Sequence, residues 1–344
     1  MKIPEFIVDL TKDPEDRFEE IGKIYGKSLR VLLKRTESAM FSGCEALVAP
    51  ILKKALKMAC EFVRDSLGEH EYMQELEGLS RHAKVDVNDL VFANVVYDLT
   101  AAFKIPGIGC TGFVHGGPDN PLIARAMDWC IPEGIGSYSM VIRYRAKDYE
   151  VLSVGFPGIN GIISGQSSVG LAMTVNQKTK DGVVGVPNWA TPTLWRIREV
   201  LENSSGYRSA RRVIGSQRIA SPAFVLMCGV NSGEACLVET DGSEYGFTRV
   251  GIGTTQAVAN HTPEGDLLDD DFDDASSEER YIAMKRRAAA LDRADVNLAK
   301  KTLGRWPINC ERTVQQMVLC PALGILELKC VDLGGTGYLQ FSSL

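Results

Sequence analysis

Residues 109–129 read GCTGFVHGGPDNPLIARAMDW. Two runs rich in strand-forming residues, TGFVHG and PLIARAM, are separated by Gly, Pro, Asp and Asn, which favour turns. The stretch therefore predicts a β-hairpin that has Cys110 at the start of its first strand and Arg125 and Asp128 on its second. Proline and glycine just upstream break a helical pattern, so Cys110 is expected where a loop gives way to extended chain.

The pattern downstream of the hairpin predicts the fold. Strand-like runs continue to about residue 178, helical periodicity appears at about 192–215 and 276–303, and further strands lie between and after these helices. Sheet, helices, sheet, helices is the order expected when two antiparallel sheets pack face to face with helices outside. We therefore predict an α+β fold with four αββα layers for residues 110–344.

The segment 1–109 has helical patterns instead. Residues 46–66 place apolar side chains at i, i+3 and i+4 spacing with Lys53, Lys54 and Lys57 opposite, and a second helix is expected over 88–103. The first of these amphipathic helices is predicted to pack on its own domain, and peripheral contact with a membrane surface stays open.

Bulk properties exclude several classes of function. A net charge of −6 gives no electrostatic reason to expect nucleic-acid binding. The chain has no apolar run approaching the roughly 20 residues of a membrane span, and no apolar stretch of signal-peptide length at its start. A cytoplasmic protein is expected, or a secreted or lysosomal one if a leader has been removed.

Neither the cysteines nor the acidic residues form a metal-binding pattern. The nine cysteines are scattered, without a C-x-x-C pair and without metal-ligand spacing to the four histidines, so mostly reduced cysteines and no zinc site are expected. The acidic stretch 264–279 lacks EF-hand spacing and is expected to be a solvated loop that borders the substrate pocket.

Cys110 is a candidate nucleophile, which needs a base, a lowered thiol pKa and donors for an oxyanion. No histidine lies in a cysteine-protease signature, although a Cys/His dyad stays open. A cysteine that begins a chain carries its own base, because its α-amino group has a pKa of about 7.7–8.0. Cys110 would gain this base if the Gly109–Cys110 bond were cut, and Gly109 presents little bulk to an attacking thiol.

The hairpin resembles the start of the mature catalytic chain in the choloylglycine hydrolase, acid ceramidase and N-acylethanolamine acid amidase superfamily of N-terminal-nucleophile hydrolases. These enzymes share a Cys-Thr start, a hairpin and an Arg-x-x-Asp, which are here Cys110, Thr111, Arg125 and Asp128. VDLTKDPEDRFEEIG and LVFANVVYDLTAAF resemble the propeptide, or α-subunit, of the ceramidase-like members. Three further positions match downstream, in GLAMTVNQ, QAVANHT and SSEERY: Asn176, Asn260 and Arg280.

The resemblance implies a mechanism. The chain would cut itself at Gly109–Cys110 into an α-chain, 1–109, and a catalytic β-chain, 110–344, which form a heterodimer; a higher oligomer stays open. The free Cys110 would then hydrolyse an amide without metal or cofactor. The implied roles of the other residues are as follows: Arg125 lowers the thiol pKa, Asp128 orients the α-amine, Asn176 and Asn260 bind the oxyanion, and Arg280 stabilises charge.

The implied substrates are small N-acyl amides. Fatty-acyl amides of the N-acylethanolamine or ceramide type fit the leader resemblance best, while bile salts, penicillin V and acyl-homoserine lactones stay open. Two alternatives concern the reaction itself. An acyltransferase of the β-lactam acyltransferase type would pass the acyl group to an amine, and an uncleaved chain would be an inert binding protein.

Overall fold

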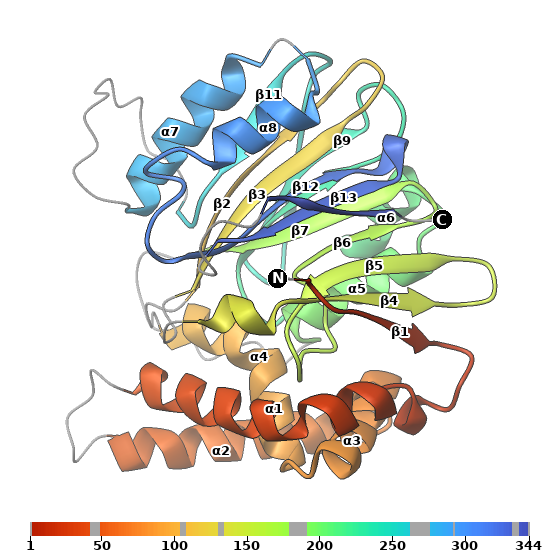
Figure 1. The fold of residues 1–344 in the computed structure, drawn as a ribbon, viewed down its shortest axis with the longest axis vertical. Helices are drawn as coiled ribbons and strands as arrows, with labels where there is room; N and C mark the ends of the chain where they lie inside the picture. The colour runs from red at the N-terminus through yellow and green to blue at the C-terminus, as the bar shows by residue number, and fades with distance from the viewer. Residues whose placement is uncertain are drawn as a thin grey trace.

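The computed structural model shows a sandwich of two sheets with helices on both outer faces and a further group of helices at one end (Figure 1). The description covers residues 2–41, 49–103, 108–129, 134–178, 191–261, 276–291, 293–331 and 337–342. Most of the acidic stretch 264–279, together with Cys44 and Cys130, lies outside these residues.

The predicted hairpin is confirmed as β2 (Ile108–His115) and β3 (Leu122–Trp129). It is central to an antiparallel six-stranded sheet of order β11-β2-β3-β12-β13-β14. The remaining strands of this sheet are β11 (Thr255–Val258), β12 (Thr313–Cys320), β13 (Ile325–Cys330) and β14 (Leu339–Ser342). Every residue of β3 is buried, which explains why its sequence is almost continuously apolar.

The second sheet has eight strands in the order β1-β4-β5-β6-β7-β8-β9-β10. Its strands are β1 (Glu5–Asp9), β4 (Met140–Arg145), β5 (Glu150–Gly155), β6 (Ser164–Ser167), β7 (Leu171–Gln177), β8 (Ala223–Cys228), β9 (Ala235–Thr240) and β10 (Tyr245–Arg249). The prediction of a helical N-terminal segment is wrong for β1, which pairs in parallel with β4 and buries Phe6 and Val8. Segment 1–109 therefore also contributes an edge strand.

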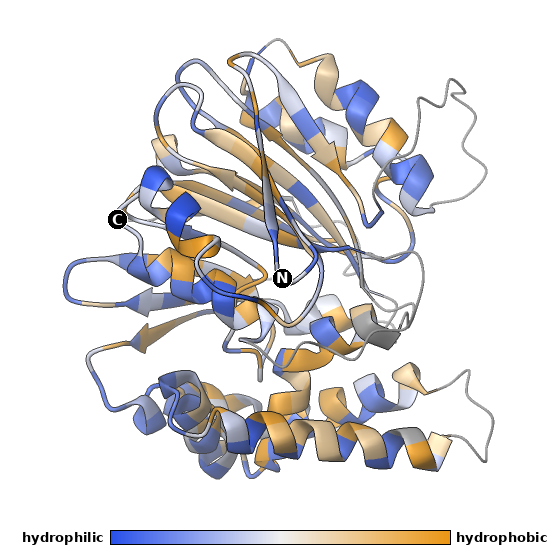
Figure 2. Cartoon of the chain, turned by 180° about the vertical axis from the view of Figure 1, so that it is seen from behind, coloured by the Kyte–Doolittle hydropathy of each residue, from blue (hydrophilic) through white to orange (hydrophobic). Residues whose placement is uncertain are grey.

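Helices cover the outer face of each sheet, which confirms the αββα layers. α7 (Ser277–Ala289) and α8 (Val296–Leu303) pack on the six-stranded sheet, and α5 (Thr193–Asn203) and α6 (Tyr207–Ile214) lie on the other side. Hydrophobic residues run along many of the strands, while the helices carry both hydrophobic and hydrophilic residues (Figure 2). This is the pattern expected when each layer buries one face against the next.

Four helices form the layer at the end of the sandwich: α1 (Glu19–Met40), α2 (Ala49–Ser66), α3 (Glu71–Ala83) and α4 (Val87–Phe103). Between α2 and α3 on one side and α5 on the other, α4 is buried along 90–100 on all sides, in keeping with its nearly uniform apolar character. It is the element through which segment 1–109 reaches the core of the sandwich.

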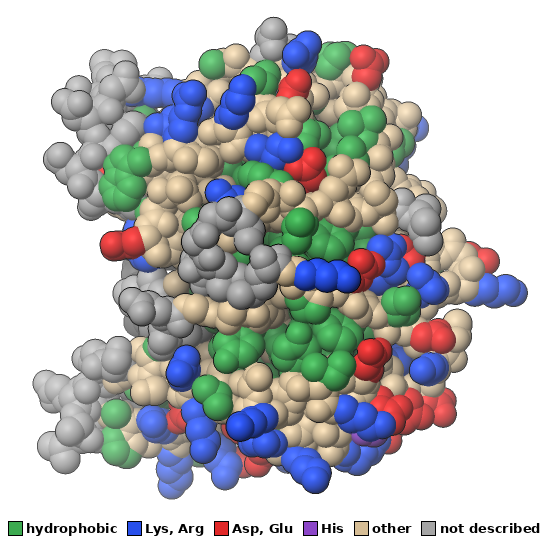
Figure 3. Space-filling model, in the orientation of Figure 1, with side chains coloured by type: hydrophobic (Ala, Val, Ile, Leu, Met, Phe, Trp, Pro, Cys, Tyr) green, Lys and Arg blue, Asp and Glu red, His purple; other side chains and the backbone are tan. Residues whose placement is uncertain are grey.

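The amphipathic helix α2 buries Cys60 and Val63 against its neighbours, so the predicted packing on its own domain is confirmed. It also leaves Ile51, Met58 and Phe62 exposed by 69%, 59% and 52%. Lys and Arg side chains gather along this helical layer (Figure 3). Contact with a membrane surface stays a prediction. Within the described ranges, no helix is both long and apolar enough to cross a bilayer.

A buried cluster of polar side chains, here called the clamp, joins α3 to the sandwich. Glu75 accepts hydrogen bonds from Arg198 Nη2 at 2.8 Å and Asn160 Nδ2 at 2.9 Å, and Tyr72 Oη donates to Glu202 at 2.6 Å. The Arg198 guanidinium lies 4.0 Å from the Tyr72 ring centre, and both Arg198 and Glu75 are fully buried. Because buried charges need good partners, the clamp fixes the position of α3 closely.

Candidate active site

Cys110 is buried at the start of β2, with its side chain directed between the two sheets. It pairs across the hairpin with Met127, so Cys110, Met127 and Arg125 share one face. Arg125 Nη2 donates a hydrogen bond to Cys110 Sγ at 2.7 Å, and the main-chain nitrogen of Cys110 donates to Asn260 Oδ1 at 2.9 Å. Two of the predicted site residues, Arg125 and Asn260, therefore contact Cys110, one at its sulfur and one at its nitrogen.

The guanidinium of Arg125 crosses the sandwich from one sheet to the other. It donates to Asn176 Oδ1 at 3.2 Å, Ser164 Oγ at 3.0 Å and the Val175 carbonyl at 3.0 Å, all on β6 and β7. These contacts stabilise a fully buried positive charge beside Cys110. Burial raises the pKa of the Cys110 thiol above its usual value, while the charge of Arg125 acts in the opposite direction. The predicted influence of Arg125 has the expected sign, but burial outweighs it.

Asp128 and Arg280 lie on the other face of the hairpin, towards α7. Arg280 Nη1 is 3.2 Å from Asp128 Oδ2 and donates to the Cys110 carbonyl at 3.0 Å, and Nη2 donates to Asn260 Oδ1 at 3.0 Å. Thr313 Oγ1 donates to Asp128 Oδ1 at 2.8 Å. Asp128 Oδ2 is buried and, among the described residues, accepts no well-aligned hydrogen bond. Arg280 thus connects the carboxylate to the main chain of Cys110.

Each of the two asparagines is held by the main chain of a residue next to the other. Asn176 Nδ2 donates to the Ala259 carbonyl at 3.3 Å, and Asn260 Nδ2 donates to the Gln177 carbonyl at 2.9 Å. Asn260 therefore turns its oxygen, and not its amide nitrogen, towards the Cys110 nitrogen. In this arrangement Asn260 serves as an acceptor for the nitrogen of Cys110. Its predicted oxyanion role, and that of Asn176, stay predictions.

Two histidines lie close to the site in sequence, but no contact joins either of them to Cys110 among the described residues. His115 is on the same strand as Cys110 but five residues away, which is roughly 16 Å in extended chain. His261 Nδ1 lies 2.8 Å from Ser277 Oγ on α7. Neither contact makes a Cys/His dyad, so the thiol's environment is set by arginine and amide groups. Within the described ranges, no group of His, Cys, Asp and Glu is arranged to hold a metal ion.

Comparison with known proteins gives distant but consistent matches. No family model matches the chain. An acid ceramidase of Balaenoptera acutorostrata scammoni is 22% identical over 264 residues, which cover 70% of this chain and 64% of that protein. The N-acylethanolamine-hydrolyzing acid amidase of Caenorhabditis elegans is 21% identical over 267 residues, 74% of this chain and 73% of that protein. The match thus spans less than two thirds of the ceramidase's length.

A solved structure agrees in fold. The Caenorhabditis elegans ortholog of N-acylethanolamine-hydrolyzing acid amidase superposes with a TM-score of 0.52 at 17% identity, over 62% of this chain and 94% of that chain. The chain therefore shares the fold of this amidase. The shared fold accounts for the αββα layers and for a cysteine placed at the start of a central strand.

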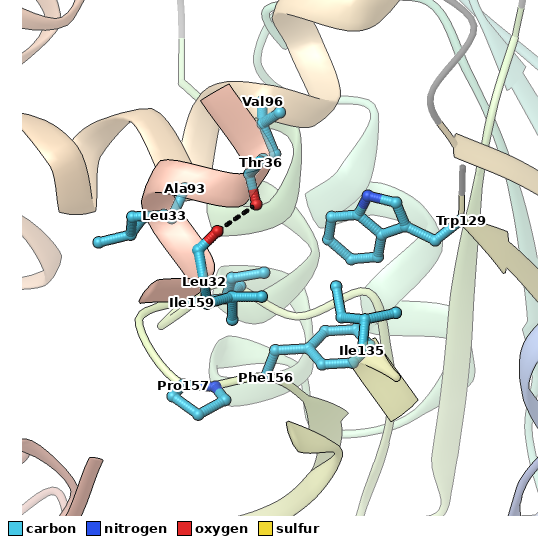
Figure 4. A pocket seen from close by; sticks show the side chains of 10 residues that line it. All are labelled: Leu32, Leu33, Thr36, Ala93, Val96, Trp129, Ile135, Phe156, Pro157 and Ile159. Atoms are coloured by element: carbon cyan, nitrogen blue, oxygen red, sulfur yellow. Dashed lines mark hydrogen bonds between the residues drawn. The ribbon is translucent and has the colours of Figure 1, made fainter. Parts of the chain in front are cut away.

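An apolar pocket lies beside Trp129, at the end of β3 (Figure 4). Trp129 lies on the same face of β3 as Met127, about 7 Å further along the strand. It faces Leu32 and Thr36 of α1 across the pocket. The remaining lining residues are Leu33, Ala93, Val96, Ile135, Phe156, Pro157 and Ile159. Both the helical segment and the sandwich therefore form its walls.

Three further residues of the site were not predicted from the sequence. Ser164 contacts Arg125, Ser277 accepts from the main-chain nitrogen of Asn260, and Thr313 contacts Asp128. Ser277 is the serine of the Ser-x-x-Arg segment through which Arg280 was predicted, so the sequence did carry a signal for its position. Ser164 and Thr313 stand in ordinary strands, so only the pairing of those strands brings them to the residues around Cys110.

Proposed function

We propose that this chain is a self-processing cysteine amidohydrolase that cleaves linear N-acyl amides through a thioester on Cys110. The proposal rests on two contacts of Cys110: Arg125 donates a hydrogen bond to its sulfur, and Asn260 accepts one from its main-chain nitrogen. A buried thiol with an arginine on its sulfur and polar side chains around its main-chain nitrogen is more than a structural cysteine needs.

Self-cleavage comes first in this proposal. Cys110 Sγ attacks the Gly109 carbonyl, the peptide C–N bond breaks, and the released nitrogen takes up the thiol proton. Water then hydrolyses the thioester to a Gly109 carboxylate and restores the thiol. Arg280 supports this step, because a methyl group added at Gly109 would lie 3.4 Å from its Nη2. Its charge is thus placed close to Gly109, the residue on whose carbonyl negative charge develops.

The cut creates the base for turnover. The new α-amine of Cys110 keeps Asn260 Oδ1 as an acceptor and gains Asp128 Oδ2, which is buried without a hydrogen bond in the described part of the uncut chain. The neutral amine takes the thiol proton, and the thiolate attacks the substrate carbonyl. The proton passes to the leaving amine, and water releases the acyl group. No cofactor enters these steps.

The lining of the pocket beside Trp129 is apolar and would suit an apolar acyl group as one half of the substrate, provided that the pocket, about 20 Å³ in the uncut chain, widens to admit it. Transfer of an acyl chain into such a pocket is favourable by about 0.8 kcal/mol for each buried CH₂. The matched proteins are named for ceramide and N-acylethanolamine hydrolysis, and these are fatty-acyl amides. We therefore propose fatty-acyl amides as the substrate class.

Intact mass spectrometry tests the first step. Wild-type protein should separate under denaturing conditions into chains 1–109 and 110–344, whereas Cys110→Ala should remain at 37.6 kDa. Cys228→Ala, which changes a buried free cysteine on β8, is the matched control and should be cut like the wild type. Turnover is then followed with N-acyl amides of increasing chain length. An uncut wild-type protein as inactive as Cys110→Ala would contradict the proposal.

A further inference from the structure

Tyr97 of α4 has a buried phenol, one of several buried polar groups that make no hydrogen bond in the described part of the chain. Its side chain is buried, and within the described ranges its Oη has no hydrogen bond. Other deeply buried tyrosines are satisfied: Tyr144 Oη donates to the Asn160 carbonyl at 2.9 Å, and Tyr72 Oη to Glu202 at 2.6 Å. A buried hydroxyl without a partner is costly, so such a group points to a ligand that supplies one.

The position of Tyr97 is fixed from the active site. Gln177, which follows Asn176 on β7, donates from Nε2 to the Tyr97 carbonyl at 2.7 Å, and its own carbonyl accepts from Asn260 Nδ2. The Tyr97 side chain packs in the same core as Cys110. Of the ionisable groups that act on the pKa of the Tyr97 phenol, Cys110 has the largest effect, ahead of Asp98 next in the chain.

The site also needs a donor. Asn176 and Asn260 each direct an amide N–H at a main-chain carbonyl, and Arg125 Nη2 is on Cys110 Sγ. A donor aimed at the oxygen of the scissile amide must remain protonated through the neutral range. The phenol of Tyr97 does so, since burial raises its pKa well above the usual value.

We propose that Tyr97 is a substrate-contacting residue whose Oη donates a hydrogen bond to the carbonyl oxygen of the amide bound at Cys110. This rests on the proposed function and adds that segment 1–109 supplies a group to the reaction itself. The bond strengthens as negative charge grows on that oxygen, so it acts mainly on kcat.

Tyr97→Phe removes the hydroxyl and keeps the ring. With an N-acyl arylamide as substrate, and rates normalised to the processed fraction from intact mass, kcat should fall about 10- to 100-fold while KM changes less than threefold. Slower self-cleavage of the folded variant also supports a donor at Cys110. The thermal midpoint should stay the same or rise, because a partnerless buried hydroxyl is removed.

Tyr144→Phe is the matched control, since it loses a satisfied hydrogen bond in the clamp region. It should lower the thermal midpoint and leave kcat within twofold. The rate of Cys110 alkylation by iodoacetamide should be unchanged in Tyr97→Phe. The proposal is overturned if Tyr97→Phe keeps wild-type kcat, or if alkylation slows as much as kcat, because Tyr97 would then act on the thiol. If wild type and Cys110→Ala are equally inactive, the proposed function fails, and this inference with it.

Discussion

Asp98 offers a quantitative test of how α4 is held in the sandwich. Its carboxylate is fully buried and accepts hydrogen bonds from Thr193 Oγ1 at 2.5 Å, Ser221 Oγ at 2.6 Å and the Thr193 nitrogen at 3.2 Å. Burial raises the pKa of Asp98 to about 6, although these hydrogen bonds lower it, whereas its usual value is 3.8. The folded protein therefore binds this proton more tightly than the unfolded chain does.

The consequence is a stability that falls as pH rises. Between about 3.8 and about 6 the folded state holds more protons at Asp98, so the free energy of unfolding declines through this window and is level above it. The difference of about two pKa units corresponds to about 3 kcal/mol. Asparagine does not titrate, so Asp98→Asn should lack this part of the pH dependence.

The assay is urea unfolding in the uncut Cys110→Ala background, where a single chain unfolds. The unfolding free energy of the Asp98 protein minus that of Asp98→Asn should decrease by about 2 kcal/mol from pH 4 to pH 7, since part of the full change already occurs below pH 4. Asp119→Asn, a substitution on the exposed hairpin turn, controls for the loss of one charge. A difference that is constant over this range would mean that the hydrogen bonds balance burial, and one that increases with pH would mean that they outweigh it; either result would refute the reasoning.

Three further predictions concern the site and the clamp. Arg125→Lys should lower kcat/KM at least 100-fold on N-acyl amides, because lysine cannot reach the sulfur and both strands at once. Glu75→Gln should lower the free energy of unfolding in urea by about 3–5 kcal/mol, since Arg198 loses a buried counter-ion. Thr313→Val should slow turnover about 10-fold, because Asp128 loses one hydrogen-bond donor while it keeps its ion pair with Arg280. An unchanged rate would show that the contact between Thr313 and Asp128 is only structural.

The fold was predictable where the pattern is local. Cys110 to Trp129 contains two strands and their turn within one stretch, and the alternation of sheets and helices gave the layers. β1 was missed because it is short and its partner β4 lies about 135 residues away. Its residues EFIVD do alternate, with Phe6 and Val8 inward, but five residues beside long helical patterns are a weak signal.

The same distinction between local and long-range features applies to the residues of the site. The resemblance carried Cys110, Arg125 and Asp128, and the structure brings them together with the other predicted side chains. Ser164 and Thr313 depend on pairing between distant strands, for which one sequence has no signal. The acceptor orientation of Asn260 is likewise a matter of geometry, since an asparagine can present either its oxygen or its nitrogen.

The position of the proposed cut explains why the fold can tolerate it. Three buried hydrogen bonds hold segment 1–109 to the sandwich. Arg198 donates to Glu75, Thr193 donates to Asp98, and Asn94 Nδ2 donates to the Gly158 carbonyl at 2.9 Å. None of these buried contacts passes through the Gly109–Cys110 bond. Breaking that bond therefore frees the nitrogen of Cys110 while α4, and with it Tyr97, stays where the uncut chain placed it. We accordingly expect the two chains to co-purify after cleavage. In a Glu75→Gln, Asp98→Ala double variant they should separate at a lower urea concentration than the one at which either chain loses its helices.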